Sequence, residues 1–346
     1  MSIKLAINGF GRIGRLAFRR AYEMNKEAGK DIFEVVAIND LVPAQTLAYL
    51  LKYDTTHRTW NADKISADET NIIFAGHKIP VLGKKDPADL KWKDFGVDVV
   101  LECTGRLKSH EDGDIHMKNG AKGVIISAPS SSKDIPTYVY GVNTDKLTKD
   151  QTIISGASCT TNCLSPMMKV LEDTYGVIGG TMTTVHAYTN DQRILDLAGS
   201  NLRRSRAGAA NIVPTTTGAA KAVGKVIPAL NGVLNGNAIR VPVTDGSICD
   251  CTLLLKKPAT VEEINAAMKK ASETNLKGIL AYNDEEIVSS DILGRTEGSI
   301  FDATLTMIIP AGEYNFVKVA SWYDNEYSFT CQMMRLAKLY GEILNK

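Results

Sequence analysis

Residues 3–14 read IKLAINGFGRIG, an apolar run that leads directly into the spacing Gly9-x-Gly11-x-x-Gly14. The apolar run is typical of a buried strand, and residues 15–24 have the pattern of a helix that follows it. At this spacing the glycines permit a tight turn, close approach of the backbone to a pyrophosphate, and close packing of the helix on the strand. The stretch therefore predicts a dinucleotide-binding unit with the pyrophosphate at the helix N-terminus.

A second strand is predicted at residues 33–38, and it ends at Asn39-Asp40. A carboxylate at this strand end is placed to accept hydrogen bonds from an adenosine ribose, and it favours NAD over NADP because it would repel the extra phosphate. Asp40 lies farther from the glycines than the usual ~20 residues. The polar insert at residues 25–31 accounts for the excess as a longer loop. The alternative is an exposed aspartate in a turn.

Strands and helices continue to alternate up to about residue 155. Residues 97–102 are nearly all apolar, as expected of a parallel strand buried on both faces, and they lead into a turn at residues 103–105. A further strand is predicted at residues 123–127, and a hairpin at residues 71–82. This alternation predicts an α/β dinucleotide-binding domain with a doubly wound parallel sheet, which binds ligands at the carboxyl ends of its strands.

Residues 155–163 read SGASCTTNC and join a short strand to a helix that opens near Cys159. Ser158 or Thr160 supplies the N-cap of this helix. A cysteine on a first helical turn lies beside unpaired N–H groups and the positive end of the helix dipole, and both favour the nucleophilic thiolate. The dipole contributes only ~0.3–2 kcal/mol, so a strong nucleophile needs a partner such as a histidine. The alternative is a buried structural cysteine.

The second half of the chain has a different organisation. Residues 180–189 form a threonine-rich strand with His186 near its end, and a long arginine-bearing segment without clear periodicity follows at residues 190–214. Strands at hairpin-like distances are predicted at 238–242, 250–255, 304–309 and 316–323, with an amphipathic helix at 261–275. These elements predict an α+β catalytic domain with a mostly antiparallel sheet. A terminal helix with one apolar face must dock elsewhere.

Composition limits the classes of function. The 346 residues suggest two domains, and 44% hydrophobic and 23% charged residues are typical of a globular protein. A net charge of +1 gives no electrostatic reason to expect a nucleic acid or membrane partner. We see no targeting leader or membrane span and expect a cytoplasmic protein. The six cysteines lack the spacing of a disulfide framework or of zinc ligands, so no metal is expected.

Four motifs together carry a resemblance to a known family: NGFGRIGR at 8–15, ASCTTNC at 157–163, TTGAAKAV at 216–223 and WYDNE at 322–326. With them the sequence resembles the phosphorylating glyceraldehyde-3-phosphate dehydrogenases along its whole length. The resemblance implies a Rossmann-type NAD domain at residues 1–157, completed by a C-terminal helix at 328–346, and a catalytic domain at 158–327. It also implies a homotetramer in which residues 190–214 line the cofactor site of a neighbouring subunit.

The resemblance implies a reaction as well. The family oxidises and phosphorylates D-glyceraldehyde 3-phosphate to 1,3-bisphosphoglycerate in glycolysis and gluconeogenesis, with hydride transfer to NAD through a cysteine thiohemiacetal and a thioester. The family pattern makes Cys159 the nucleophile and His186 its base, which agrees with the need of a first-turn cysteine for a partner. The backbone N–H of Cys159 is a reasonable oxyanion donor because it lies at a helix start.

The resemblance also assigns binding residues. The positions that would hold the substrate phosphate and the attacking inorganic phosphate are Ser158, Thr160, Thr189, Arg204, Thr217, Gly218 and Arg240. For Arg204 a solvated or subunit-contact role remains an alternative. The cofactor positions are Gly9, Gly11, Arg12, Ile13, Gly14, Asp40, Lys85, Ser127 and, at the nicotinamide carboxamide, Asn325. Lys84 could replace Lys85. Ala198 stands where NAD-specific members commonly carry proline, which weakens the case for strict NAD selectivity.

Two other functions are compatible with parts of the sequence. An erythrose-4-phosphate dehydrogenase would use the same cysteine and histidine but water as the second nucleophile, and the intact Thr217, Gly218 and Arg240 set favours phosphate instead. An NAD-binding protein in which a low-pKa Cys159 acts as a redox switch would need neither anion site. Turnover of phosphorylated aldehydes with and without phosphate separates the three.

Overall fold

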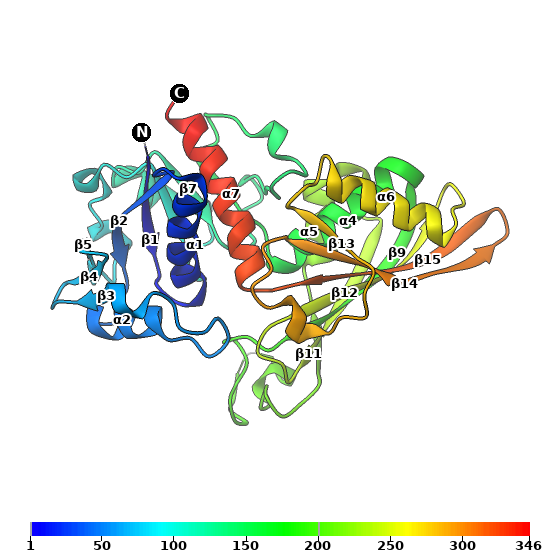
Figure 1. The fold of residues 1–346 in the computed structure, drawn as a ribbon, viewed down its shortest axis with the longest axis horizontal. Helices are drawn as coiled ribbons and strands as arrows, with labels where there is room; N and C mark the ends of the chain where they lie inside the picture. Colours follow the sequence, from blue (N-terminus) through cyan, green and yellow to red (C-terminus); the bar gives the residue numbers. More distant parts are fainter. Residues whose placement is uncertain (1, 200) are drawn as a thin grey trace. The chain divides into compact units, whose positions relative to one another are not determined.

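The computed structural model describes residues 2–199 and 201–346 (Figure 1). The chain forms two compact units. The first comprises the residues up to 138 together with 146–157 and 333–346, and the second comprises 139–145 and 158–332. Among the described residues, none of the helices combines the length and the apolar character that crossing a lipid bilayer requires.

The first unit is built on a parallel five-stranded sheet in the order β2-β1-β6-β7-β8. Its strands are β1 (Ile3–Asn8), β2 (Phe33–Asn39), β6 (Val99–Glu102), β7 (Gly123–Ile126) and β8 (Ile153–Ser155). Its helices are α1 (Arg12–Ala28), α2 (Ala44–Lys52) and α3 (His110–Lys118). The chain order reverses at β1, between β2 and β6, which is where doubly wound sheets bind ligands. The predicted parallel sheet is therefore confirmed.

A small antiparallel sheet completes the first unit, with strands β3 (Ile65–Ala67), β4 (Asn71–Phe74) and β5 (His77–Pro80). The last two strands confirm the predicted hairpin. The apolar side chains of β1 and β6 are almost fully buried, because helices cover a doubly wound sheet on both faces.

The second unit contains a seven-stranded sheet in the order β10-β11-β9-β12-β15-β14-β13. Its strands are β9 (Val177–Ala187), β10 (Val213–Thr216), β11 (Leu234–Val241), β12 (Ser247–Leu255), β13 (Leu280–Asn283), β14 (Ser299–Ala311) and β15 (Tyr314–Tyr323). Four strand pairs are antiparallel, whereas β11 pairs with β9 and β13 with β14 in parallel. The sheet is therefore mixed and mostly antiparallel, as predicted.

Helices α4 (Cys159–Tyr175), α5 (Ala219–Val226) and α6 (Val261–Glu273) accompany this sheet, and α4 packs on β14 and β15. Short 3-10 helices lie in the connections of both units, at Ala62–Lys64, Pro87–Asp89, Trp92–Phe95, Thr144–Lys146, Arg203–Ser205, Pro228–Leu230 and Ser289–Ile292. The sequence pattern missed α5 and the edge strands β10 and β13. Pro214 obscured β10, since proline lacks the N–H of a regular strand and is tolerated at a sheet edge.

The last helix, α7 (Tyr327–Leu344), ends in residues that belong to the first unit. The hydroxyl of Tyr340 is within 2.7 Å of the backbone oxygen of Gln151 and donates a hydrogen bond to it. Gly123 lies directly under Tyr340 and Leu344, so that a side chain at this glycine would clash with both. The terminal helix is thus bound to the first unit by this partly buried hydrogen bond and by close packing against β7.

Removing that hydrogen bond should destabilise the chain measurably. We expect Tyr340→Phe to lower the free energy of unfolding by about 1 kcal/mol, because the Gln151 oxygen loses its buried donor. Urea denaturation followed by circular dichroism measures the change. As a matched control, Tyr49→Phe alters an exposed tyrosine and should stay within about 0.5 kcal/mol of the wild type. Equal effects of the two variants would contradict the role given to Tyr340.

Candidate active site

Cys159 is the first residue of α4, as the sequence predicted. Ser158 is the N-cap, and its hydroxyl accepts a hydrogen bond from the Thr161 N–H at 3.1 Å. Ala157 adopts a left-handed backbone conformation with a φ of 62°, which is uncommon for a residue with a side chain and marks a sharp entry into the helix. The strand end and this turn fix the direction of the half-buried Cys159 side chain.

The Sγ of Cys159 lies 3.5 Å from Nε2 of His186, which stands near the end of β9. Nδ1 of His186 lies 2.7 Å from the backbone oxygen of Ala187. Arg240, the register partner of His186 on β11, donates from Nη1 to the same oxygen at 3.0 Å and to the Thr189 hydroxyl at 3.1 Å. Nη1 of Arg240 also lies 2.9 Å from Nδ1 of His186, so Nδ1 faces an acceptor, the Ala187 oxygen, and a donor. The tautomer that gives its Nδ1 proton to Ala187 is the one that presents a lone pair on Nε2 to the thiol.

The charges around this pair act in opposite directions. Burial raises the pKa of the Cys159 thiol to about 11, while the positive charge of Arg240 lowers it. Burial and the same charge lower the pKa of His186 to about 3. In the free chain, burial thus outweighs the charge of Arg240 and the hydrogen bonds of Thr160, and the neutral thiol is favoured. The expected low-pKa thiolate is corrected accordingly: the thiol proton must pass to His186 as the sulfur reacts.

Tyr323, at the end of β15, supports this pair from behind. Its hydroxyl lies 2.9 Å from the hydroxyl of Thr160 and 2.7 Å from that of Thr184, and its ring meets the His186 ring edge to face at 5.8 Å. The Thr160 hydroxyl is thus directed at Tyr323 and, at 4.0 Å, at Cys159 Sγ. Sequence reasoning quoted Tyr323 only as part of a motif and gave it no role.

Thr189, Arg204 and Arg240 come together as a connected cluster with Asp191, which the sequence analysis missed. The Asp191 carboxylate accepts hydrogen bonds from the Thr189 hydroxyl and from Nη1 of Arg204, and Nε of Arg204 donates to the Thr215 hydroxyl at 3.0 Å. Burial raises the pKa of Asp191, but these bonds and the arginine charges hold it below its usual range. A carboxylate two residues after Thr189 is the sequence feature that could have indicated this arrangement.

The remaining two residues of the predicted anion set lie at the start of α5. The Thr217 hydroxyl accepts from the N–H of Ala219, the first residue of α5, at 3.2 Å, and Gly218 is the N-cap of this helix. Gly218 is exposed, and no atom lies within 4 Å of where a side chain would begin. A cavity of about 360 Å³ borders the arginine cluster and is lined by Asp191, Arg193, Gly199, Asn201, Arg204, Ser205 and Thr216. Backbone N–H groups, hydroxyls and guanidinium groups together suit phosphate.

The glycine-rich turn of the first unit has the close contacts expected of a dinucleotide site. Gly9 has a φ of 90°, and a side chain there would come within 2.7 Å of the Thr104 nitrogen; at Gly14 it would come within 2.1 Å of the Gly9 oxygen. Gly11, the N-cap of α1, faces open space instead. Only glycine fits at positions 9 and 14, whereas Gly11 leaves room for a ligand to approach the helix N-terminus.

Asp40 and the two lysines surround the same open space. The Asp40 carboxylate accepts from the backbone N–H of Phe10 at 2.7 Å and of Val42 at 3.1 Å. A cavity of about 430 Å³ is lined by Asn8, Gly9, Gly11, Asn39, Asp40, Leu41, Lys84, Lys85, Pro87, Cys103, Thr104, Arg106 and Leu107. Lys84 and Lys85 both line it, so the structure does not separate them. A concave site with glycines at a helix start and one ribose-type carboxylate fits NAD.

The other four predicted cofactor residues lie in different surroundings. The Arg12 guanidinium forms an ion pair with Asp54 at 2.9 Å, so what Arg12 and Ile13 offer a ligand is their N–H groups at the start of α1. Ser127 follows β7, and its N–H donates to the backbone oxygen of Glu102 at 3.0 Å. In the second unit, Asn325 accepts at its side-chain oxygen from the Ser247 hydroxyl at 2.7 Å, and Ser247 accepts from the Ala187 N–H at 3.1 Å.

Comparison with known proteins assigns both units to one family. The sequence matches the family described as "Glyceraldehyde 3-phosphate dehydrogenase, NAD binding domain" over residues 3–110 and the corresponding C-terminal domain over residues 158–325. It is similar to the glyceraldehyde-3-phosphate dehydrogenase of Thermotoga maritima, with 54% identity over 97% of this chain and 98% of that protein. The enzymes of Lactobacillus delbrueckii subsp. bulgaricus and Geobacillus stearothermophilus are each 52% identical, over the same shares of the chains.

The charge of Arg240 should be measurable at the Cys159 thiol. In a His186→Asn background, where the thiol is the titrating group of the pair, we expect Arg240→Met to move the pH midpoint of alkylation by iodoacetamide upward. Arg240 lowers the thiol pKa, so its loss leaves less thiolate at a given pH. Mass spectrometry of the Cys159 peptide reports the rate. Arg240→Lys, which keeps the charge, should move the midpoint less, and an unchanged midpoint with methionine would refute the assignment.

Proposed function

Because the chain belongs to the glyceraldehyde-3-phosphate dehydrogenase family and is an NAD-dependent enzyme that oxidises glyceraldehyde 3-phosphate in glycolysis, we propose that Cys159 and His186 carry out its chemistry. One observation carries the proposal: Cys159 Sγ lies 3.5 Å from Nε2 of His186, within reach for transfer of the thiol proton. We further propose that residues 1–157 with the C-terminal helix form the NAD-binding domain and residues 158–327 the catalytic domain. The two compact units support this division.

In the first step, Cys159 Sγ attacks the aldehyde carbon of D-glyceraldehyde 3-phosphate, and the thiol proton passes to His186 Nε2. The N–H of Cys159 at the start of α4 stabilises the negative charge that develops on the carbonyl oxygen, and His186 Nε2 then passes the thiol proton to this oxygen to give a thiohemiacetal and a neutral imidazole. His186 then removes the hydroxyl proton while the carbon is oxidised, which leaves a thioester on Cys159. NAD, when bound, supplies the acceptor for the hydride.

In the second step, inorganic phosphate attacks the thioester carbon, the C–S bond breaks, and the products are 1,3-bisphosphoglycerate and free Cys159. The two phosphate groups need cationic and N–H donors, which Arg204, Arg240 and Thr189 supply with Ser158, Thr160, Thr217 and Gly218. Asp191 is added to this set as the residue that orients Arg204 and Thr189, because it bonds to both. The Thr160 hydroxyl faces Tyr323, so its contribution would be its backbone N–H.

For the cofactor, we propose that the N–H groups of the turn from Gly9 to Gly14, with those of Arg12 and Ile13, hold the pyrophosphate of NAD. Asp40 accepts from the adenosine ribose, and its two backbone bonds keep its carboxylate in place. Lys85 and Ser127 lie along the rest of the cofactor. Asn325 holds the nicotinamide carboxamide. Its side chain is fixed by the hydrogen bond from the Ser247 hydroxyl, and this hydroxyl is held in turn by the N–H of Ala187.

The mechanism predicts a strict requirement for phosphate. With glyceraldehyde 3-phosphate and NAD but no phosphate, we expect NADH formation to stop after about one equivalent per site, because the thioester cannot turn over. Cys159→Ser should abolish the burst and the steady state, and His186→Asn should lower the rate by about 10²–10⁴-fold. Absorbance at the NADH band follows both phases.

The matched control is Cys163→Ser, which changes a buried cysteine one helical turn further along α4 and should keep both phases. Sustained turnover of the wild type without phosphate would refute the acyl-phosphate mechanism and would instead indicate water as the second nucleophile.

We also propose a homotetramer. The segment 190–214 exposes several large apolar side chains, among them Ile194 and Leu202 at 88% and 86% exposure. Such a concentration is typical of a surface that another subunit covers. We expect sedimentation velocity to give four times the mass of the chain, and Leu202→Asp to dissociate the assembly at micromolar concentration. Val288→Asp, at another exposed apolar side chain, is the control. A monomeric wild type would contradict the proposal.

A further inference from the structure

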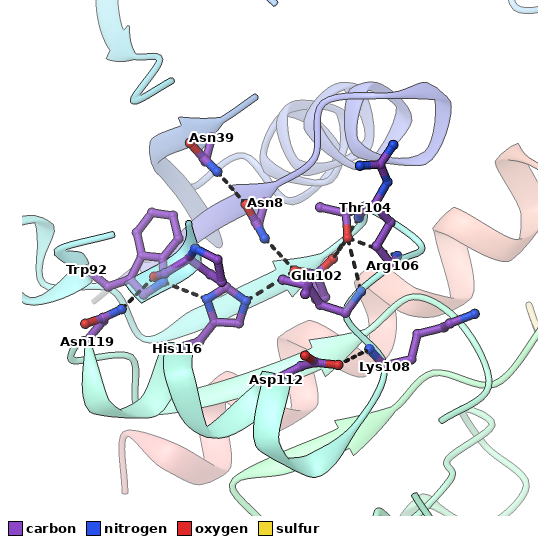
Figure 2. Close-up of polar contacts among 12 residues, drawn as sticks. Asn8, Asn39, Trp92, Glu102, Thr104, Arg106, Lys108, Asp112, His116 and Asn119 are labelled. Atoms are coloured by element: carbon purple, nitrogen blue, oxygen red, sulfur yellow. Dashed lines mark hydrogen bonds and ion pairs between the residues drawn. The ribbon is translucent and has the colours of Figure 1, made fainter. Parts of the chain in front are cut away.

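Glu102, the last residue of β6, is a carboxylate buried beneath the cofactor cavity of the first unit, with 2% of its surface exposed. Its Oε2 accepts from the side-chain amide of Asn8 at 2.5 Å and lies 3.2 Å from Nε2 of His116. Its Oε1 accepts from the N–H of Thr104 at 2.8 Å and from the Thr104 hydroxyl. Figure 2 shows these side chains meeting at Glu102 from β1, α3 and the turn after β6.

The hydrogens of this cluster can be assigned. Trp92 is a donor only, and its Nε1–H reaches Nδ1 of His116 at 3.0 Å, so Nδ1 accepts and Nε2 carries the proton that goes to Glu102. The Thr104 hydroxyl accepts from the N–H groups of Arg106 and Leu107 at 3.1 and 3.4 Å, so its own proton also points to Glu102. All four groups that bond to the carboxylate are therefore donors.

The network continues from Asn8 to the far wall of the cavity. The side-chain oxygen of Asn8 accepts from the amide of Asn39 at 2.8 Å. Asn39 in turn bonds to both backbone groups of Lys84, accepting from its N–H at 2.8 Å and donating to its oxygen at 3.0 Å. Asn8 directly precedes Gly9, and Asn39 directly precedes Asp40, so each amide fixes the residue next to one that the cofactor would contact.

Every wall of the cofactor cavity is therefore bonded to Glu102 directly or through one or two side chains. The four walls are the end of β1, the end of β2, the segment 84–87 and the turn 103–107, and all four line the cavity of about 430 Å³. A carboxylate suits the centre of such a cluster because it can accept several bonds at once without any donor of its own. The charge of Glu102 also acts on Cys103, a residue of the cavity lining, because burial and this charge raise the pKa of the Cys103 thiol.

We propose that Glu102 is a positioning residue for NAD: together with His116 and the two asparagines, it holds the four walls of the adenosine side of the cofactor site at their binding distance. This inference rests on the proposed placement of NAD in this cavity. Glu102 acts through Asn8, Asn39 and Thr104, and His116 acts by supplying a fixed N–H. Trp92 sets which nitrogen of His116 carries that proton.

The central test replaces the carboxylate by an amide of the same shape. In Glu102→Gln, the new NH₂ group replaces one carboxylate oxygen and therefore faces either Asn8 and His116, or Thr104. All of these groups are donors, so the hydrogen bonds on that side of the network are lost. We expect the dissociation constants of NAD and of ADP-ribose, measured by calorimetry on the full chain, to rise together by about tenfold or more. The kcat at saturating NAD should stay within about twofold. A rise in the dissociation constant that NAD and ADP-ribose share places the effect on the adenosine side of the site.

Two further variants separate positioning from stability. Tyr138→Phe is the matched control, since it removes a buried hydroxyl of the same unit that bonds to Gln151 at 2.6 Å and lies outside the cavity lining. It should lower the melting temperature without changing either dissociation constant. Trp92→Phe removes the donor to His116 and should weaken both ligands in the same direction as Glu102→Gln, but less. It also provides the test if Glu102→Gln does not fold.

The outcomes are distinct. Unchanged NAD and ADP-ribose affinities in Glu102→Gln, or a fall in kcat with unchanged affinities, would overturn the inference and leave the network a purely structural one. If Glu102→Gln does not fold, unchanged affinities in Trp92→Phe would overturn it equally. A wild-type chain that binds NAD but does not turn over glyceraldehyde 3-phosphate would refute the catalytic proposal and leave this inference standing. A wild type that binds no NAD would refute both.

Discussion

The backbone oxygen of Ala187 is the acceptor around which the catalytic residues of this chain are arranged. It lies 2.7 Å from Nδ1 of His186 and accepts one proton of Arg240, and both side chains reach it because β9 and β11 pair in parallel with these two residues as partners. Together with Arg240 Nη1, which lies 2.9 Å from the same Nδ1, this acceptor sets the orientation of the His186 ring, aims Nε2 at Cys159 and holds a positive charge next to the pair. A slip of the strand register by one residue would turn Arg240 to the opposite face of the sheet and lose all three effects.

Burial and charge oppose each other at Cys159, and the balance gives the site its properties. Burial raises the thiol pKa, and Arg240 lowers it, so the reactive thiolate is reached by transfer of the proton to His186. Burial and the same charge lower the pKa of His186, which keeps the imidazole neutral before the reaction. Arg240 therefore acts on both partners, although it was inferred from the sequence only as a phosphate ligand. Its bond to Thr189 links the catalytic pair to the anion cluster.

Much of the fold and the catalytic pair could be predicted, because these features depend on local signals. The glycine spacing before α1, the apolar strands of the parallel sheet and the cysteine at the start of α4 are each encoded within a few neighbouring residues. The role of Asp191 and the burial that raises the pKa of Cys159 depend on contacts across the fold. Strands β10 and β13 were missed because edge strands are short and carry weak patterns. Long-range partners are not visible in a single sequence, even when their residue types are.

The two buried histidines show how the partner at Nδ1 decides what an imidazole does. At His186, Nδ1 lies 2.7 Å from the Ala187 oxygen and 2.9 Å from Arg240 Nη1, and the tautomer that bonds to the oxygen leaves Nε2 as a base towards the thiol. His116 meets the Trp92 N–H, a donor, so its proton sits on Nε2 and binds the Glu102 carboxylate. Trp92 thus makes His116 a fixed donor, whereas the surroundings of His186 allow it to accept and return a proton. Residue type alone therefore assigns neither role, because each depends on the atoms around Nδ1.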